Sequence, residues 1–170
     1  MKPIAKKHLI FASDGKIDDF APNGRTPNGS SEWKEFISTN TLSENFMRKH
    51  EKQHFDFFVW AQIAWFQRHL SDDFIRDFHQ NLKLENWTLK NQQLSESLME
   101  ELQDKINWID AFATQKMSNT FKKKFFHKYE IAANVIINRE ISDDEYKTEM
   151  EKFRKNVLDK KEKLKKSLGL

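Results

Sequence analysis

The residues best suited to chemistry are two histidines four positions apart, in the run His50-Glu51-Lys52-Gln53-His54. Residues four apart share one face of a helix, so the imidazoles of His50 and His54 can together hold one zinc ion. Glu51 is then the candidate catalytic group, because a glutamate beside a zinc ion polarises a bound water. A zinc-dependent hydrolase is therefore one hypothesis for the function.

This five-residue run resembles the signature of zinc-dependent peptidases, which implies zinc as a cofactor, the histidines as ligands and the glutamate as general base. It departs from that family at Lys52 and Gln53, where the family has apolar residues that bury the helix. A third ligand is unassigned: His69 lies more than about 20 Å further along the same helix, which leaves Glu85 and His127 as candidates. The alternative is a pair of exposed histidines where the helix leaves the core.

A second candidate site lies in the basic C-terminal third, because residues 115–170 carry 15 Lys+Arg against 9 Asp+Glu although the whole chain has a net charge of only +3. Lysines at helical spacing can neutralise phosphates, which makes this third a candidate nucleic-acid-binding surface. The sequence has no arginine-rich base-recognition motif and no recognisable helix-turn-helix beside these lysines. The alternative is that they only form the solvated face of a helix. The candidate partner- or nucleic-acid-binding residues are Lys122, Lys123, Lys124, Lys128, Lys160, Lys161, Lys165 and Lys166.

Long helices must position both sets of residues, since the chain has only four Gly and three Pro in 170 residues. The sequence TLSE at residues 41–44 indicates a capping box, which opens a helix that we expect to run to Leu70 and to carry both histidines. The stretch from Phe55 to Phe66 is apolar on all sides, so we expect it to lie at the centre of the fold. It is shorter than the roughly 20 residues of a membrane-spanning helix, so we expect no membrane association.

Further helices follow from capping residues and from the spacing of apolar residues. Ser71 is expected to cap a helix with Phe74, Phe78 and Leu82 on its inner side. Other helices are predicted over about 95–113, over about 114–139 and over 142–168. The last is long enough for part of its apolar seam, which includes Phe153, Val157 and Leu164, to project, so self-association through 142–168 is a further expectation.

The expected fold class is all-α, a single-domain bundle of five to six helices over residues 31–170. Residues 1–30 are expected to form an irregular segment or a short β-hairpin, because Asp14-Gly15 suits a type I′ turn. Of the 22 aromatic residues, 15 are Phe, which has no polar handle, so we expect the rings to fill the core.

The leading functional hypothesis is a non-enzymatic binding protein: a regulator, inhibitor or effector that docks on another macromolecule, first of all a protein. The chain shows no phosphate-cradling glycine loop and no nucleophile elbow, so ordinary enzyme chemistry has no visible site and no cofactor is expected. It has no cysteine and no signal-peptide-like N-terminal stretch, which favours a cytoplasmic location. Nucleic-acid binding and zinc hydrolysis are the alternatives.

Overall fold

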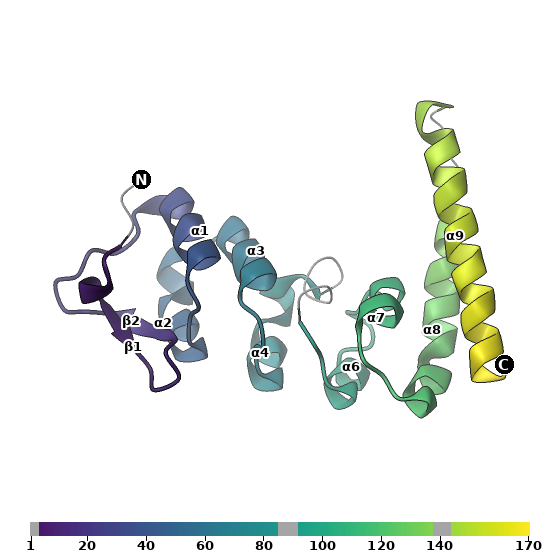
Figure 1. Ribbon diagram of the computed structural model, residues 1–170, viewed down its shortest axis with the longest axis horizontal. Helices are drawn as coiled ribbons and strands as arrows, with labels where there is room; N and C mark the ends of the chain where they lie inside the picture. Colours follow the sequence, from purple (N-terminus) through teal and green to yellow (C-terminus); the bar gives the residue numbers. More distant parts are fainter. Residues whose placement is uncertain (1–3, 85–91, 138–143) are drawn as a thin grey trace. The chain divides into compact units, whose positions relative to one another are not determined.

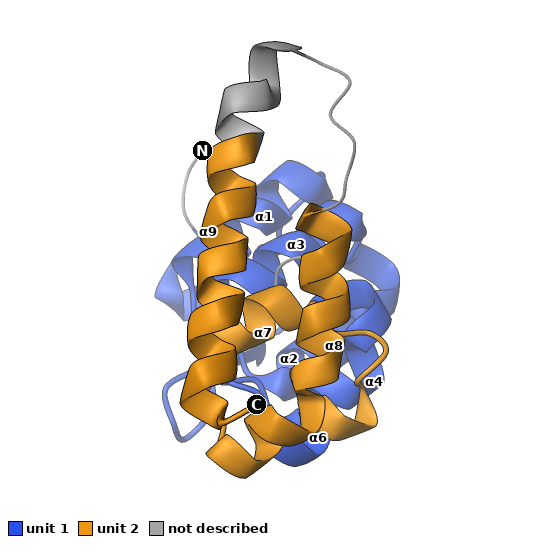
Figure 2. Ribbon diagram, turned by 90° about the vertical axis from the view of Figure 1, so that its right-hand side faces the viewer, with its two compact units in different colours: residues 1–98 blue, residues 99–170 orange. Residues whose placement is uncertain are grey.

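The computed structural model of the protein describes residues 4–84, 92–137 and 144–170. Helices make up 66% of the chain and follow a short two-stranded antiparallel hairpin, which confirms the all-α class with an N-terminal hairpin (Figure 1). The chain divides into two compact units, residues 1–98 and 99–170 (Figure 2), so the expected single domain over residues 31–170 stays a prediction. Within the described residues, no helix has the length and apolar character needed to cross a membrane.

Among the described residues, unit 1 contains the hairpin, a 3₁₀ helix, four whole α-helices and the start of α6. Its elements are a 3₁₀ helix at Lys6–His8, β1 at Leu9–Phe11, β2 at Ile17–Phe20, α1 at Gly29–Thr39, α2 at Glu44–His54, α3 at Phe57–Phe66 and α4 at Asp72–Leu82. Helix α3 packs against α1 and α4, while β2 lies against α2. Aromatic rings fill much of the space between them, as expected; the buried ones include Trp33, Phe36, Phe46, Trp60 and Phe74.

The hairpin forms at the Asp-Gly pair that predicted it, but its turn is not of type I′. Strands β1 and β2 pair antiparallel, with Leu9 opposite Phe20. In the turn only Gly15 has a positive φ, of 80°, whereas a type I′ turn requires positive φ at both central residues. Beyond the turn, Ile17 bridges in parallel to Leu42, which ties the hairpin to the segment that precedes α2.

The expected single helix from residues 41–44 to Leu70 is wrong. The structure has two helices there, and Asp56 separates them. The Asp56 side chain accepts a hydrogen bond from the Val59 N–H at 2.9 Å, so it acts as the N-cap of α3. One aspartate within an apolar run therefore starts a new helix, which the hydrophobic pattern alone did not reveal.

Helix α4 begins as predicted. The Ser71 hydroxyl accepts a hydrogen bond from the Phe74 N–H at 3.1 Å, which satisfies one of the free donors of the first turn. Phe74 and Leu82 are buried, whereas Phe78 is half-buried at a kink where its φ is −115°. The helix ends at Leu82, and the next residue, Lys83, has a left-handed φ of 52°.

Helix α6 spans Glu96–Glu101, and the boundary between the two units falls within it. Unit 2 also contains α7 at Trp108–Thr114, α8 at Asn119–Ile137 and α9 at Asp144–Leu168. The expected continuous helix over 95–113 is wrong, because α6 and α7 are separate. Asn107 caps α7 by accepting hydrogen bonds from the N–H groups of Ile109 and Asp110 at 3.0 and 3.2 Å. The long C-terminal helix is confirmed from Asp144 onward, while residues 142 and 143 lie outside the described residues.

Ring packing joins α7 to α8. Trp108 stacks on Phe125 with 4.9 Å between ring centroids, and Phe112 lies 5.0 Å from Tyr129. All four residues come from these two helices, so α7 and α8 share one aromatic layer. This layer confirms that rings fill the interior of unit 2 as well as that of unit 1.

Helices α8 and α9 run antiparallel, side by side (Figures 1 and 2). Val157 and Leu168 are buried in the apolar seam of α9, and Leu164 is half-buried. Phe153, which we expected in the same seam, is 47% exposed and lies outside it. The seam thus packs on α8 of the same chain. Self-association through 142–168 stays a prediction.

Candidate binding surfaces

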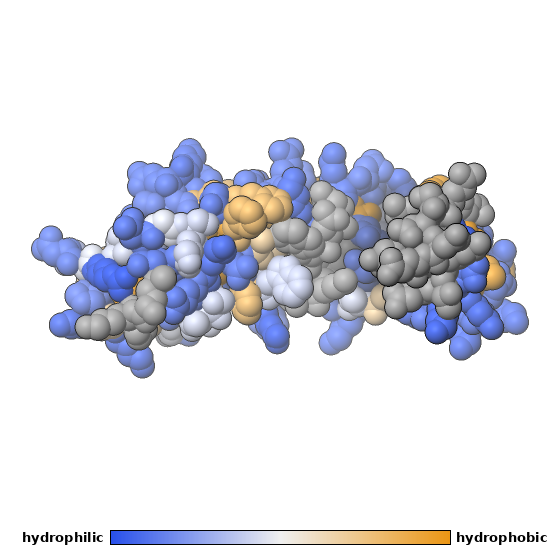
Figure 3. All heavy atoms as spheres, turned by 90° about the horizontal axis from the view of Figure 1, so that it is seen from above, coloured by the Kyte–Doolittle hydropathy of each residue, from blue (hydrophilic) through white to orange (hydrophobic). Residues whose placement is uncertain are grey.

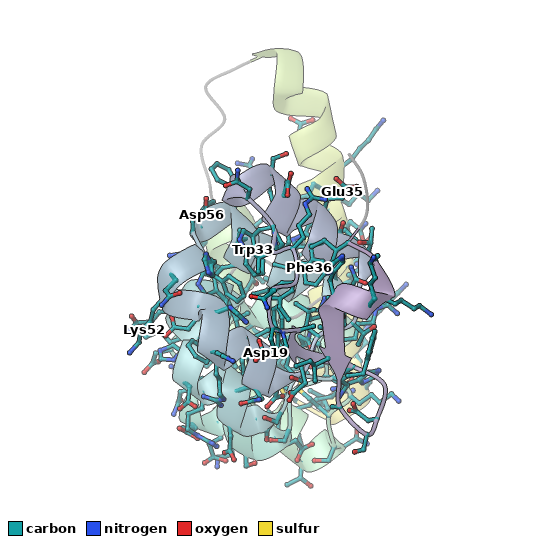
Figure 4. The ribbon with its side chains drawn as sticks, turned by 90° about the vertical axis from the view of Figure 1, so that its left-hand side faces the viewer. Asp19, Trp33, Glu35, Phe36, Lys52 and Asp56 are labelled. Atoms are coloured by element: carbon teal, nitrogen blue, oxygen red, sulfur yellow. The ribbon has the colours of Figure 1, made fainter. Side chains whose placement is uncertain are left out.

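The two histidines of the zinc-like motif lie on one face of α2 and pack against aromatic rings. Their own ring centroids are 5.8 Å apart. Trp33 of α1 contacts both, because it stacks on His54 at 5.1 Å and lies tilted against His50 at 5.9 Å. His50 Nε2 also lies 3.3 Å from Asp19 Oδ1 of β2. Figure 4 shows Trp33 inside unit 1, whereas Lys52, which lies between the two histidines in the motif, projects away from the unit.

The described residues bring no third ligand to these histidines. No group of three or more His, Cys, Asp or Glu side chains able to hold a metal ion occurs among them. His69 is exposed beyond the end of α3, and the candidate Glu85 lies outside the described residues. Glu51, the candidate base, is half-buried one residue along α2 and so faces a different direction from its neighbouring histidine. The zinc site stays a prediction.

The charge state of His50 follows from its surroundings. Burial lowers the pKa of His50 below its ordinary value, and the hydrogen bond with Asp19 opposes that shift only in part. Burial by itself would raise the pKa of Asp19, but hydrogen bonds from Lys49, from the Phe20 N–H and from His50 outweigh it and lower that pKa. His50 is therefore a neutral ring at pH 7, held by an ionised carboxylate within an aromatic cluster.

The outer side of α3 carries four exposed aromatic side chains, which we call the α3 aromatic face. They are Phe57, Phe58, Trp65 and Phe66, with exposed fractions of 52%, 58%, 54% and 48%. Only the opposite side of α3 is buried, through Val59, Trp60, Ile63 and Ala64. The expectation that this whole helix is surrounded by protein is therefore wrong. Figure 3 shows hydrophobic side chains at the surface over α3.

Polar side chains fix α3 at both of its ends. Asp56 caps the N-terminal end, and Gln67 follows the C-terminal end with only 2% of its surface exposed. The Gln67 side chain accepts a hydrogen bond from the Leu42 N–H at 2.8 Å. It donates two more, each of 2.8 Å, to the carbonyl oxygens of Ile37 and Asn40. The α3 aromatic face is thus presented by a helix held in place by hydrogen bonds.

The charges beside the α3 aromatic face differ between its two ends. A hydrogen bond from the Val59 N–H lowers the pKa of Asp56, so the N-terminal end carries a carboxylate at neutral pH. Arg68 is exposed just beyond the C-terminal end. Between them, the Lys34 ammonium lies 5.2 Å from the centroid of the Phe58 ring, a cation–π distance. The four aromatic positions themselves carry no charge.

The eight lysines proposed for binding fall into two groups. Three form ion pairs within unit 2: Lys124 with Glu100 at 2.5 Å, Lys128 with Asp104 at 2.7 Å and Lys161 with Glu130 at 3.1 Å. Five form no ion pair with any part of the chain that the structure describes: Lys122, Lys123, Lys160, Lys165 and Lys166. The positive charge available to a ligand is therefore smaller than the sequence suggests, because three of the eight lysines already face a carboxylate.

Antiparallel packing places four of the five remaining lysines near one end of the α8–α9 pair. The first turn of α8 and the last turns of α9 lie at the same end (Figures 1 and 2). Lys122 and Lys123 of α8 therefore lie at the end where Lys165 and Lys166 of α9 also lie, and we call these four residues the basic end. Two runs more than forty residues apart in the sequence contribute to it.

Sequence reasoning missed three features of unit 1: the partner of His50, the buried Gln67 and the α3 aromatic face. Asp56 did signal where α3 begins, since an aspartate directly before an apolar run is a common N-cap, but it gave no signal that one side of α3 is exposed. The sequence around Asp19 and Gln67 offers no comparable signal, because their partners lie about thirty residues away along the chain.

Comparison with models of known protein families, with curated proteins and with solved structures finds no match to this chain. The two surfaces described above are therefore the basis for assigning a function.

Proposed function

We propose that this protein is a non-enzymatic binding protein that docks on another protein through the α3 aromatic face. The observation that carries the proposal is the exposure of four aromatic side chains on one side of a single helix. Single exposed apolar residues are ordinary, but contiguous apolar patches of about 300–600 Å² on monomers often mark contact sites. Four half-exposed rings approach that size.

The way in which α3 is held also supports a binding role. A surface that is ordered before binding loses less conformational entropy when a partner docks, which favours affinity. Asp56 and Gln67 provide that order at the two ends of the helix. Aromatic side chains are also enriched among the residues that contribute most to protein–protein affinity. Such a surface suits a regulator, inhibitor or effector whose activity is the contact itself.

The test begins with recovery of a partner from the native host by affinity pull-down, its identification and its purification. The purified partner is then mixed with wild-type protein and with the double variant Phe58→Ser, Trp65→Ser on a sizing column. Wild type should co-elute with the partner, and the variant should not. The control is Ile131→Ser, Val135→Ser, because these α8 side chains are 61% and 66% exposed outside the proposed site. Equal binding by the α3 variant would contradict the proposal.

A second candidate function is nucleic-acid binding by the basic end. The observation that favours it is the gathering of Lys122, Lys123, Lys165 and Lys166 without carboxylate partners among the described residues. Each lysine that neutralises a phosphate releases a counterion, so binding should weaken steeply as salt rises. Such binding would be sequence-independent, because lysines on two helices provide charge and no base-reading pattern.

Gel retardation of DNA and RNA over a salt series tests this second candidate. Replacement of Lys122, Lys123 and Lys166 by Gln should abolish retardation. Replacement of the ion-paired Lys124, Lys128 and Lys161 by Gln removes the same number of positive charges and should have the smaller effect. Equal losses in the two variants would show that only net charge matters, and no retardation by wild type at low salt would rule the candidate out.

A further inference from the structure

Two short segments of unit 1 have the same sequence, Pro-Asn-Gly, at residues 22–24 and 27–29. In an asparagine–glycine pair the main-chain nitrogen of the glycine can attack the asparagine side chain, because glycine has no Cβ to obstruct the approach. Both asparagines, Asn23 and Asn28, are exposed to solvent. A difference in reactivity between the two pairs must therefore come from how the fold holds each of them.

The first pair is held in a packed turn. The Gly24 N–H donates a hydrogen bond to the Ala21 carbonyl oxygen at 2.7 Å, which closes a four-residue turn. Asn23 is the third residue of this turn and has a φ of 62°, the sign that a type II turn requires there. Gly24 also lies close to the hairpin, since a Cβ at this position would be 2.9 Å from the His8 carbonyl oxygen. The nitrogen that would attack Asn23 is thus already hydrogen-bonded.

The second pair lacks both restraints. Gly29 is the first residue of α1, so its N–H has no partner within the helix, and it forms no hydrogen bond elsewhere in the described part of the chain. A Cβ at Gly29 would meet no atom within 4 Å. Asn28 is the N-cap residue, but its side chain makes no capping hydrogen bond. Its main-chain N–H donates to Glu32 Oε2 at 3.0 Å, and neither reacting group takes part in that bond.

We propose that Asn28 is a site of spontaneous deamidation, whereas Asn23 in the same sequence is protected. The Gly29 nitrogen loses its proton and attacks Asn28 Cγ. A bond forms between Cγ and this nitrogen, the bond between Cγ and Nδ2 breaks, and ammonia leaves with the proton that Gly29 has lost. Water then opens the resulting succinimide ring. Attack at the side-chain carbonyl gives aspartate, and attack at the main-chain carbonyl gives isoaspartate, which has one additional CH₂ in the main chain.

The cost of closing the ring differs between the two pairs. The main chain must first rotate at Asn28, whose ψ is 112°, so that the Gly29 nitrogen reaches Cγ. This rotation disturbs only the first turn of α1, and helix ends fray readily. The same rotation at Asn23 breaks the hydrogen bond of Gly24. One such bond and the local opening that it opposes should slow the reaction of Asn23 by at least about fivefold.

The aspartate product suits its position in the fold. Aspartate is among the best N-cap residues, and the positive end of the helix dipole favours a carboxylate there. This product therefore adds a negative charge at the start of α1 and leaves the helix in place. Isoaspartate instead lengthens the main chain at the point where α1 begins. It is also a substrate for methyltransferases that act on the isoaspartyl carboxylate, which provides a second means of detection.

Peptide mapping of aged protein tests the proposal. Purified full-length protein is incubated in mildly alkaline buffer, and samples are digested with trypsin and analysed by mass spectrometry. Trypsin cleaves after Arg25, so the two asparagines lie on separate peptides, residues 17–25 and 26–34. In folded protein the peptide with Asn28 should deamidate at least about fivefold faster than the peptide with Asn23. In concentrated urea the two rates should become similar, because the reacting sequence is the same.

Two matched variants check the assignment through methyl transfer to isoaspartate. Asn28→Ser removes the reacting amide and retains a good N-cap, and Asn23→Gly suits the positive φ at that position. Aged wild type and aged Asn23→Gly should accept similar amounts of labelled methyl groups, whereas aged Asn28→Ser should lose most of the label.

Each result decides for or against the proposal. Equal rates in folded protein, or a faster reaction at Asn23, would overturn it. So would a folded protein in which neither asparagine reacts while both react in urea, since the first turn of α1 would then protect Asn28. A preference for Asn28 that persists unchanged in urea would show that the fold is not its cause.

Discussion

Helices α2 and α3 follow one another in the chain, and each departs in part from what its own sequence suggests. Helix α2 is polar and carries the residues that indicated chemistry, yet His50 and His54 pack against Trp33. Helix α3 is apolar throughout and indicated a central core helix, yet half of it is exposed. His54 stays exposed although it lies against Trp33, whereas His50 is half-buried. Polarity alone therefore did not tell which side chains of these two helices face solvent.

The difference between the two helices lies in their neighbours. The imidazoles of α2 meet β2 and α1, which supply a carboxylate for one imidazole and a ring for both. Helix α3 packs against α1 and α4 through its buried side, and the four aromatic side chains of its other side stay about half exposed. The type of a residue limits which contacts its side chain can form, whereas the packing of distant segments determines which of these contacts it forms.

Truncation of one ring on each side of α3 should give the largest difference in stability. Trp60→Ala removes a ring that is only 3% exposed, so the free energy of unfolding should fall by about 3–5 kcal/mol. Trp65→Ala removes a ring that is 54% exposed and should cost less than about 1 kcal/mol. Urea denaturation measures both. Equal losses would contradict the two-sided description of α3.

Gln67→Leu should have the next largest effect. It leaves the Leu42 N–H and the carbonyls of Ile37 and Asn40 without their side-chain partner, and each buried group left unsatisfied costs about 1–3 kcal/mol. We expect a total loss of about 3 kcal/mol in urea denaturation, because part of this cost is offset by relaxation. Gln62→Leu is the control on the same helix and should change stability little. A similar loss in both variants would show that Gln67 does not anchor α3.

Asp56→Ala should have a smaller effect, because the main interaction that it removes is the hydrogen bond from the Val59 N–H. Loss of an N-cap of this kind costs about 1 kcal/mol. Asp56→Asn retains an oxygen acceptor in the same position, so its stability should stay within a few tenths of a kcal/mol of wild type. Thermal or urea denaturation of both variants measures the difference, and an Asn variant as weak as the Ala variant would contradict the capping role.

The smallest expected effect is the change of the free energy of unfolding with pH that His50 of α2 causes. Burial lowers the pKa of His50 from its ordinary value of 6.5, so the unfolded chain takes up this proton before the folded chain does. The stability that depends on neutral His50 is therefore fully present above pH 6.5 and is lost as the pH falls below that value. Urea denaturation at pH 7 and pH 5 should show this loss in wild type, and His50→Gln should reduce it.

His127→Gln is the matched control for this pH dependence, since His127 is exposed on α8 of the other unit. It should leave the loss between pH 7 and pH 5 as large as in wild type. A pH dependence that disappears in His127→Gln and persists in His50→Gln would show that His50 is not the buried group described above.

Local sequence signals predicted the parts of the fold that depend on near neighbours. The Asp14-Gly15 pair predicted the hairpin, Ser71 predicted the start of α4, and the spacing of apolar residues predicted α9. In each case the deciding interaction lies within a few residues, as with the hydrogen bond between the Ser71 hydroxyl and the Phe74 N–H. Helix class and the aromatic core followed from composition and periodicity for the same reason.

The candidate sites could not be predicted in the same way, because they depend on contacts between distant segments. The exposure of Trp65 depends on which elements pack beside α3, and periodicity does not contain that information. The gathering of Lys122 with Lys166 depends on the antiparallel course of α8 and α9, which the spacing within either helix does not specify. The break at Asp56 was the exception, since its signal was local but was outweighed by the apolar residues that follow it.

The Gln67 side chain also has a consequence for how unit 1 opens. Its amide connects the end of α3 to α1 and to the segment before α2, which are 25 to 30 residues earlier in the chain. The Gln67 side chain accepts a hydrogen bond from the Leu42 N–H, so this amide proton can exchange with solvent only when the three segments separate together. Deuterium uptake at that single proton should therefore be among the slowest in unit 1, and its rate should report the cooperative opening of the whole unit.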